Sequence, residues 1–231
     1  MERDVNSVRL VLRIGGSVVA SPINAGLINE YVDLLKALHR NGHALAAVVG
    51  GGVLAREFIS AAEDLGLAEE AQDEVAISVS RLFAQVFLAK LGKSGCATVP
   101  VTIEQAMEHL QRGKVVVMGG LRPGMTTDAV AAMVAERMKA GLYVKGTDQE
   151  GVYDKDPRKC ADAVKLDHMT FKDLSRVLAE SKHKAGIHQV LDPEAVKLLE
   201  RGKVKVVVVN GSRPENVLLA VEGKKVGTLI E

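Results

Sequence analysis

Three consecutive glycines, Gly50 to Gly52, join an apolar run to a helical pattern in the stretch AVVGGGVLAREF. Each glycine weakens a strand or helix by roughly 0.5–1 kcal/mol relative to alanine, so the run indicates backbone that passes close to something bulky. Backbone N–H groups at a strand-to-helix junction can hold a phosphate, and Arg56 could add charge-assisted hydrogen bonds to it. The alternative is that Arg56 is a solvated surface residue.

A second stretch, VVVMGGLRPGMTTDAVAAMVAE, carries polar groups at the start of a predicted helix. An apolar run enters Gly119 and Gly120, and Thr126, Thr127 and Asp128 follow a turn. Threonine and aspartate are good N-caps, which is a purely structural explanation for all three. One cap needs only one such residue, so the others are available to bind a ligand or to orient a reacting group.

Two further loops have ambiguous chemistry. Gly15-Gly16-Ser17 follows the first apolar run, and it is either an anion-binding turn or a simple tight turn. The loop GTDQEGVYDKDPRK, residues 146–159, groups four acidic residues around Tyr153. It suits a nucleoside or metal-bound phosphates, although its aspartate, proline and glycine are also ordinary turn residues.

The elements that position these loops alternate between strand and helix. Such alternation predicts an α/β fold with a parallel sheet covered on both faces, in which ligands bind beyond the carboxyl ends of the strands. All four loops follow a predicted strand. The predicted strands are 7–14, 44–49, 97–101, 114–120, 141–147 and 203–211, with a hairpin at 221–231; the predicted helices are 28–42, 53–66, 70–92, 103–113, 128–141, 170–180 and 193–202.

Composition excludes several classes of protein. A net charge of +1, 3% aromatic residues and no tryptophan argue against nucleic acid as the main partner. We expect no membrane span and no signal peptide, and therefore a cytoplasmic protein. Cys96 and Cys160 belong to no metal-binding pattern and are expected to be free thiols.

Taken together, the four loops resemble the amino-acid kinase superfamily, and most closely the archaeal-type uridylate (UMP) kinases. The similarity extends from IGGSVV through VVGGGVLAREFI and the GGLRPGMTTDAVAA segment to EGVYDKDPR and the last third of the chain. It implies a three-layer αβα sandwich with a mainly parallel central sheet. It also implies a single domain over residues 1–231, with an acceptor lobe at roughly 1–140 and an ATP lobe at roughly 141–231.

The resemblance implies transfer of the γ-phosphoryl group of ATP to UMP, with Mg²⁺ as cofactor and a homohexamer as assembly. No direct protein ligand of the metal is predicted. The implied catalytic residues are Arg13, Arg56 and Asp128. The implied ATP-binding residues are Gly16, Ser17, Gly52, Arg56, Thr147, Asp148, Tyr153 and Asp156, and the implied UMP-binding residues are Gly51, Asp73, Gly120, Leu121, Arg122, Pro123, Gly124, Met125 and Thr126.

The sequence departs from the family pattern at several positions. Arg13 stands where many members have lysine, and it is either a contact to the transferred phosphoryl group or an exposed strand-end residue. Glu150 replaces a usual aspartate, Phe83 a usual asparagine and Ala76 a usual glycine. Lys145 occupies a typically apolar strand position, where it either supplies a cation to the site or marks a sheet edge.

These departures leave two alternatives to a UMP kinase. One is a kinase of the same superfamily with a different acceptor, such as a small carboxylate or another phosphate monoester. The other is a storage or sensor protein that binds nucleotides or oxyanions without turnover. A panel of acceptors separates the two kinases, and ligand binding without phosphoryl transfer would identify the binding protein.

Overall fold

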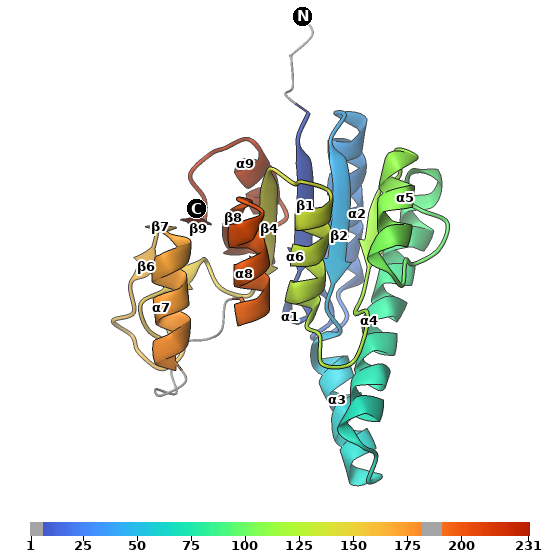
Figure 1. The fold of residues 1–231 in the computed structure, drawn as a ribbon, viewed down its shortest axis with the longest axis horizontal. Helices are drawn as coiled ribbons and strands as arrows, with labels where there is room; N and C mark the ends of the chain where they lie inside the picture. Colours follow the sequence, from blue (N-terminus) through green and yellow to red (C-terminus); the bar gives the residue numbers. More distant parts are fainter. Residues whose placement is uncertain (1–6, 182–190) are drawn as a thin grey trace, which may run out of the picture.

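A computed structural model describes residues 7–181 and 191–231 and confirms the αβα architecture. One seven-stranded sheet has the order β3-β2-β1-β4-β8-β9-β7 (Figure 1). Its strands are β1 (Arg9–Ile14), β2 (Ala44–Val49), β3 (Val116–Met118), β4 (Leu142–Thr147), β7 (His168–Met169), β8 (Lys205–Asn210) and β9 (Thr228–Ile230). Neighbouring strands run parallel except for β8 and β9, which are antiparallel.

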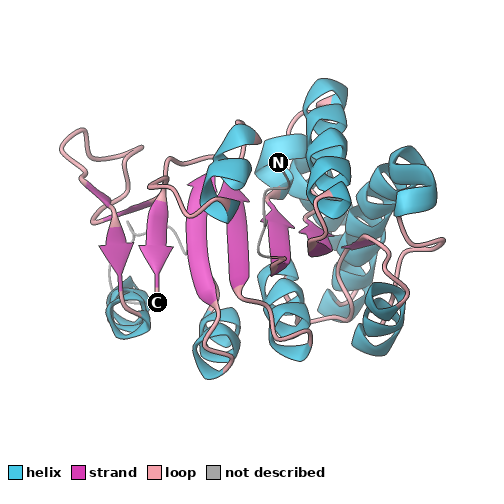
Figure 2. Cartoon of the chain, turned by 90° about the horizontal axis from the view of Figure 1, so that it is seen from above, coloured by secondary structure: helices cyan, strands magenta, loops and turns pink. Residues whose placement is uncertain are grey.

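Helices cover both faces of the sheet (Figure 2). On one face α6 (Thr127–Arg137) packs on β1 and β2 beside α8 (Pro193–Arg201), and α5 (Ile103–Gln111) packs on α6. On the other face α2 (Ala25–Arg40) packs on β2, and α9 (Glu215–Val221) packs on β4 and β8. The remaining helices are α1 (Gly16–Val19), α3 (Gly52–Asp64), α4 (Glu69–Leu91), α7 (Phe171–Ser181) and the 3-10 turn η1 (Gly92–Ser94); β5 (Val152–Tyr153) and β6 (Lys165–Leu166) form a separate two-stranded sheet.

The central strands are apolar because helices bury them on both sides. In β2 every residue after Ala44 is buried, and Leu10, Val11 and Leu12 of β1 are fully buried as well. The exception is β4, where Tyr143 and Lys145 alternate with apolar neighbours and are also buried. A strand in the middle of a sheet therefore carries an ammonium group in its interior.

Two of the predicted elements are wrong. Residues 97–101 form no strand, and only a single bridge between Gly95 and Val115 pairs nearby backbone. Pro100 explains the absence of this strand, since proline donates no hydrogen bond to a ladder.

The predicted C-terminal hairpin is also absent. Val221 is the last residue of helix α9, which the sequence analysis did not predict, and β9 pairs with β8 instead. The helical spacing of the buried residues Val217 and Ala220 was the overlooked signal.

The expectation that no segment is long and apolar enough to span a membrane is also wrong by length and composition alone. The segment Glu69–Ser94, which contains α4, meets both criteria, because an 18-residue window within it has a mean hydropathy of 1.4. In the fold, α4 packs on β2 and β3 and buries Phe83, Ala84 and Phe87. Core helices of globular proteins pass the same test, so the segment is weak evidence for a membrane span.

Candidate active site

The four glycine-containing loops meet at the carboxyl ends of β1, β2, β3 and β4, as the sequence predicts. The Gly15 amide donates to the Gly146 carbonyl at 2.9 Å, and the Gly50 amide donates to the Ile14 carbonyl at 3.1 Å. The loop after β1 is therefore held between the loops after β2 and β4. We call the region formed by the loops after β1, β2 and β4 the glycine junction.

Within the junction, Gly16 and Gly52 are in backbone contact. A Cβ atom on Gly16 would come 2.5 Å from the Gly52 Cα atom, and one on Gly52 would overlap the Gly16 carbonyl oxygen. Gly52 also has a φ of +63°, which glycine adopts at little cost. Close packing of two loops thus accounts for both glycines, before any ligand is considered.

The junction still offers backbone donors to an anion. The amides of Gly16, Gly51 and Gly52 donate to no other group in the described part of the chain, as is usual where helices begin. The Val53 amide, in contrast, donates a hydrogen bond to the Ser21 hydroxyl at 2.8 Å. Unpaired N–H groups at helix starts favour negatively charged ligands.

A buried group of three charges lies beside this junction. Asp128, in the first turn of α6, contacts Arg13 Nε through Oδ1 at 3.1 Å and Lys145 Nζ through Oδ2 at 2.7 Å. The Tyr143 hydroxyl lies 3.5 Å from Oδ1. We call Arg13, Asp128 and Lys145 the charge cluster.

Burial and charge oppose each other in this cluster. Burial alone would raise the pKa of Asp128, but the charges of Lys145 and Arg13, with the hydrogen bonds from Lys145 and Tyr143, hold it below the usual 3.8. Burial lowers the pKa of Lys145, and the charge of Asp128 partly opposes this. Asp128 is therefore ionised at neutral pH with both oxygens engaged, which suits it to orient cations rather than to accept a proton.

The guanidinium of Arg13 points from the cluster to the glycine junction. Its Nη1 donates to the Ile14 carbonyl at 2.7 Å, and its Nη2 donates to the Thr127 hydroxyl at 2.8 Å. A Cβ atom on Gly50 would come 3.2 Å from both of these nitrogens. Arg13 thus lies beside the glycine junction with its side chain 12% exposed, and the alternative of an exposed strand-end residue is wrong. A contact of Arg13 with the transferred phosphoryl group stays a prediction.

The loop that follows β3, residues 119–126, is fixed on α4. Arg81 donates from Nε to the Gly120 carbonyl at 3.0 Å and from Nη2 to the Leu121 carbonyl at 2.8 Å. The Gly120 amide donates to the Ser80 hydroxyl, and the Gly124 amide donates to Asp73 Oδ2 at 2.6 Å. Asp73 therefore lies beside the predicted acceptor loop, and a carboxylate retains capacity for a further donor.

A second connection joins the starts of α6 and α8. The Thr126 hydroxyl caps α6 by accepting from the Ala129 amide, and it donates to Asp192 Oδ2 at 2.5 Å. The other oxygen of Asp192 caps α8 through the amides of Glu194 and Ala195, each at 2.9 Å. Thr126 and Asp192 thereby hold two helix starts together next to the charge cluster.

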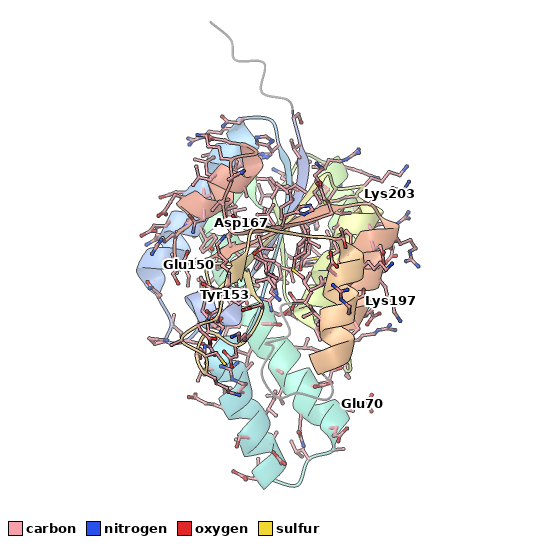
Figure 3. All side chains as sticks on the ribbon, turned by 90° about the vertical axis from the view of Figure 1, so that its left-hand side faces the viewer. Glu70, Glu150, Tyr153, Asp167, Lys197 and Lys203 are labelled. Carbon is pink, nitrogen blue, oxygen red and sulfur yellow. The ribbon has the colours of Figure 1, made fainter. Side chains whose placement is uncertain are left out.

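The predicted nucleotide-side residues follow β4. Thr147 pairs with Asn210 of β8, and its carbonyl accepts from the Gly211 amide at 2.7 Å. Asp148 bonds Arg158 at 2.5 Å, and Glu150 accepts from the Asn210 amide group at 2.8 Å. Figure 3 labels Glu150 and Tyr153, which both belong to this loop.

The structure places the remaining predicted residues as follows. Arg56 is exposed on α3, where it forms no hydrogen bond or ion pair with another described residue. Ser17 is exposed at the start of α1, and Asp156 is buried and accepts from the Arg158 amide. Gly51 is the N-cap residue of α3. Arg122, Pro123 and Met125 are partly or fully exposed in the loop on α4.

Sequence reasoning missed Ser80, Arg81, Tyr143 and Asp192 as site residues, whereas Thr127 was among the helix-start residues that it singled out. A signal existed for two of them, because Asp73, Ser80 and Arg81 are seven and eight residues apart and share one face of a helix. The alternative that Lys145 marks a sheet edge is wrong, because β4 lies between β1 and β8 in the sheet. That Lys145 supplies a cation to the site stays a prediction.

A large cavity lies away from this site. It has a volume of about 590 Å³ and is lined by Leu142, Lys205 and Leu229, together with Asp167, which Figure 3 labels. Leu142 and Lys205 are at the amino ends of β4 and β8, opposite to the glycine junction. No group of three or more histidine, cysteine, aspartate or glutamate side chains within residues 7–181 and 191–231 is arranged to hold a metal ion.

Residues 8–210 match the model of the Amino acid kinase family. The chain belongs to this family. The uridylate kinase of Methanocaldococcus jannaschii is 44% identical over 226 residues, which cover 97% of this chain and all of that protein. The uridylate kinase of Natronomonas pharaonis is 38% identical over 96% of this chain and 97% of its own length.

Solved structures agree with this assignment. The crystal structure of a uridylate kinase from Archaeoglobus fulgidus superposes with a TM-score of 0.87 at 37% identity, covering 96% of this chain and all of that one. A UMP kinase from Bacillus anthracis superposes with a TM-score of 0.82 at 20% identity, covering 96% of this chain and 95% of its own. At that lower identity the similarity concerns the amino acid kinase fold alone.

Proposed function

We propose that the protein transfers the γ-phosphoryl group of ATP to UMP and releases UDP and ADP, in pyrimidine nucleotide biosynthesis. The single observation that carries the proposal is the contact between the glycine junction and the charge cluster, opposite an acceptor loop fixed on α4. Family membership and extended similarity to uridylate kinases support the same reaction.

The arrangement suits phosphoryl transfer because this reaction needs positioning and charge stabilisation more than covalent chemistry. The free amides of Gly16, Gly51 and Gly52 would bind phosphate oxygens, and Arg13 would stabilise the charge of the transferred group. Asp128 orients Arg13. Thr147, Asp148, Tyr153 and Asp156 would hold the adenosine part of ATP, and Asp73 would accept hydrogen bonds from the ribose of UMP.

Mg²⁺ would enter this site with ATP. Both oxygens of Asp128 already contact cations, so the charge cluster offers no vacant carboxylate to a metal ion. Magnesium in such sites usually keeps several water molecules and is bound by one or two carboxylates as well as by substrate phosphates, so here the phosphates of ATP would supply most of its ligands other than water. The ion would neutralise phosphate charge, and the chain's own contribution remains the placement of the phosphates by backbone amides and Arg13.

Measuring ADP release with a panel of nucleoside monophosphates tests the reaction. We expect UMP to stimulate release far more than CMP or buffer. If a small carboxylate or another phosphate monoester stimulates release instead, the chain is a family member with a different acceptor.

A storage or sensor protein is the second candidate, and one observation favours it. Several groups of the charge cluster and of the acceptor loop are held by internal hydrogen bonds, as in a rigid binding site. This candidate predicts that ATP and UMP raise the melting temperature without any ADP release. Turnover that depends on UMP would eliminate it.

For the assembly, we propose a homohexamer in the cytoplasm, with an acceptor lobe at roughly 1–140 and an ATP lobe at roughly 141–231. Exposed apolar side chains support self-association. Phe58 of α3 and Leu82 of α4 line a groove of about 530 Å³ on the surface. Light scattering coupled to size-exclusion chromatography would measure the mass of the assembly, and a monomeric mass would contradict it.

A further inference from the structure

A lysine lies in the interior of the central sheet, where burial of an apolar side chain would cost less free energy. Lys145 is opposite Arg13 of β1 and Val208 of β8, and only 7% of it is exposed. Taking an ammonium group out of water is unfavourable unless a partner compensates it. The partner of Lys145 is Asp128. Asp128 also contacts Arg13, so it would keep one cationic partner if Lys145 were replaced.

The charges of these three side chains do not cancel. Arg13 and Lys145 carry two positive charges and Asp128 carries one negative charge, so the three sum to +1. Asp192, at the start of α8, is a further negative charge that acts on Lys145 from outside the cluster. Arg13 and Asp128 alone would be a neutral pair. Lys145 therefore supplies the excess charge, while each carboxylate oxygen of Asp128 stays with one cation.

The excess charge is directed toward the glycine junction. The Nη1 and Nη2 atoms of Arg13 lie against Gly50, because a Cβ atom on Gly50 would come 3.2 Å from each of them. Lys145 lies on the adjacent strand, behind the carboxylate, and donates to Asp128 Oδ2. Arg13 is thus the cation that faces a bound phosphate, and Lys145 acts through Asp128.

We propose that Lys145 is a positioning residue that offsets the charge of Asp128, so that Asp128 does not neutralise Arg13 and Arg13 presents positive charge to the phosphates bound at the glycine junction. The proposal rests on the function proposed above. A purely structural ion pair is the alternative, and it predicts effects on folding alone. Fixed charges in a site that excludes water act strongly on developing negative charge, so the expected effect on turnover exceeds that on binding.

Lys145→Met tests the proposal, because methionine has a similar length and carries no charge. We expect kcat to fall at least about tenfold and the Kd for ATP to rise about threefold to tenfold, with the Kd for adenosine unchanged. Lys205→Met is the matched control, since Lys205 is an exposed lysine of the same sheet that pairs with Glu231 at 3.0 Å. We expect the control to bind ATP and turn over like the native protein.

A double variant separates charge from structure. In Lys145→Met the cluster is formally neutral, and adding Asp128→Asn returns its net charge to +1. We therefore expect the double variant to bind ATP more tightly than Lys145→Met does. If Lys145 only stabilises the fold, the two losses will multiply, as they do for independent effects.

Titration calorimetry with ATP in the absence of UMP keeps this test separate from the proposed reaction. A native protein that binds ATP but shows no turnover with UMP would reject the proposed function and leave the comparison of ATP affinities intact. If Lys145→Met does not fold, Lys145→Gln replaces it, since an amide keeps a hydrogen bond to Asp128. Unchanged ATP affinity in the folded variants, or no rescue in the double variant, would overturn the inference.

Discussion

Ion pairs of the same chemical types occur in two very different regions of this protein. In the charge cluster, the side chains of Arg13, Asp128 and Lys145 are 9–14% exposed and lie under α6. In the segment between β4 and β7, which we call the acidic arm, Lys155 pairs with Asp162 and Arg158 pairs with Asp148 at 38–77% exposure. Both regions contain short contacts, and only their exposure to water separates them.

The difference shows that burial, and not contact distance, decides what an ion pair can do. Water and salt screen the pairs of the acidic arm, and such pairs usually contribute about 0–1 kcal/mol to stability. In the charge cluster the carboxylate of Asp128 is largely removed from water, so its two cations set its geometry. Preorganised charge of this kind is available to a reaction, whereas the pairs of the arm can rearrange freely.

The largest effect should come from the backbone contact that supports the buried region. Gly16→Ala would place a methyl group 2.5 Å from the Gly52 Cα atom, so we expect a loss of several kcal/mol in the free energy of unfolding and of most activity. Gly26→Ala is the control, because Gly26 lies in α2 with its nearest atom at 3.4 Å. Urea denaturation should show a neutral or slightly stabilised control. Equal stability of the two variants would mean that the loops at the junction can separate.

Asp128→Asn should lower kcat about 100-fold or more, since the amide pairs poorly with two cations and misplaces Arg13. The equivalent change in the acidic arm, Asp162→Asn, should leave kcat within about twofold of the native value. Circular dichroism would establish that both variants are folded before initial rates are compared. Similar rates in the two variants would contradict the conclusion that burial makes the charge cluster, and not the acidic arm, important for the reaction.

Arg56→Ala tests the role of an exposed arginine in α3, the helix that begins at the glycine junction. We expect kcat to fall about tenfold with an unchanged melting temperature, because Arg56 has no partner among the described residues and would serve only a bound phosphate. Arg176→Ala is the control, because Arg176 is an exposed arginine of α7 that pairs with Asp173 in the same helix. A kcat equal to that of the native protein would make Arg56 a solvated surface residue.

Asp73→Ala should mainly affect the binding of the acceptor. We expect the KM for UMP to rise about tenfold with little change in kcat, because a ribose contact is largely uniform binding. The loss of the Gly124 hydrogen bond would loosen the loop on α4 and act in the same direction. Initial rates over a range of UMP concentrations would measure both constants. A large fall in kcat with an unchanged KM would place Asp73 nearer to the reacting groups.

The smallest expected effect is the change in the free energy of unfolding at acidic pH. The pKa of Asp128 is held below 3.8 in the folded protein, so its stabilising contribution is complete above about pH 3.8 and is lost as the pH falls through the lowered value. The stability difference between the native protein and Asp128→Asn should therefore shrink below pH 3.8. The pKa of Asp162 is lowered too, by a hydrogen bond and the charge of Lys155, but at an exposed site. Repeating the titration in 1 M salt should weaken only the contribution of Asp162.

The sequence alone was enough to predict the αβα fold and the edge of the sheet at which the glycine-containing loops meet. Alternating apolar and helical patterns predict strands and helices, and glycines after four strands predict loops that meet at one edge of a sheet. Thr126 and Asp128 at a helix start were identifiable from the chemistry of N-caps. These features depend on local periodicity and on residue type, which a single sequence displays directly.

Only the tertiary structure decided which residues share the site. Lys145 contacts Asp128 because β4 lies beside β1 and because residues 143 and 145 face α6, and neither fact follows from local spacing. Gly16 packs against Gly52, and Arg81 holds the loop after β3, across separations of 36 and about 40 residues. The order of strands in a sheet results from the burial of every element at once. A buried lysine at the centre of a strand therefore gains its role only when its neighbours are in place.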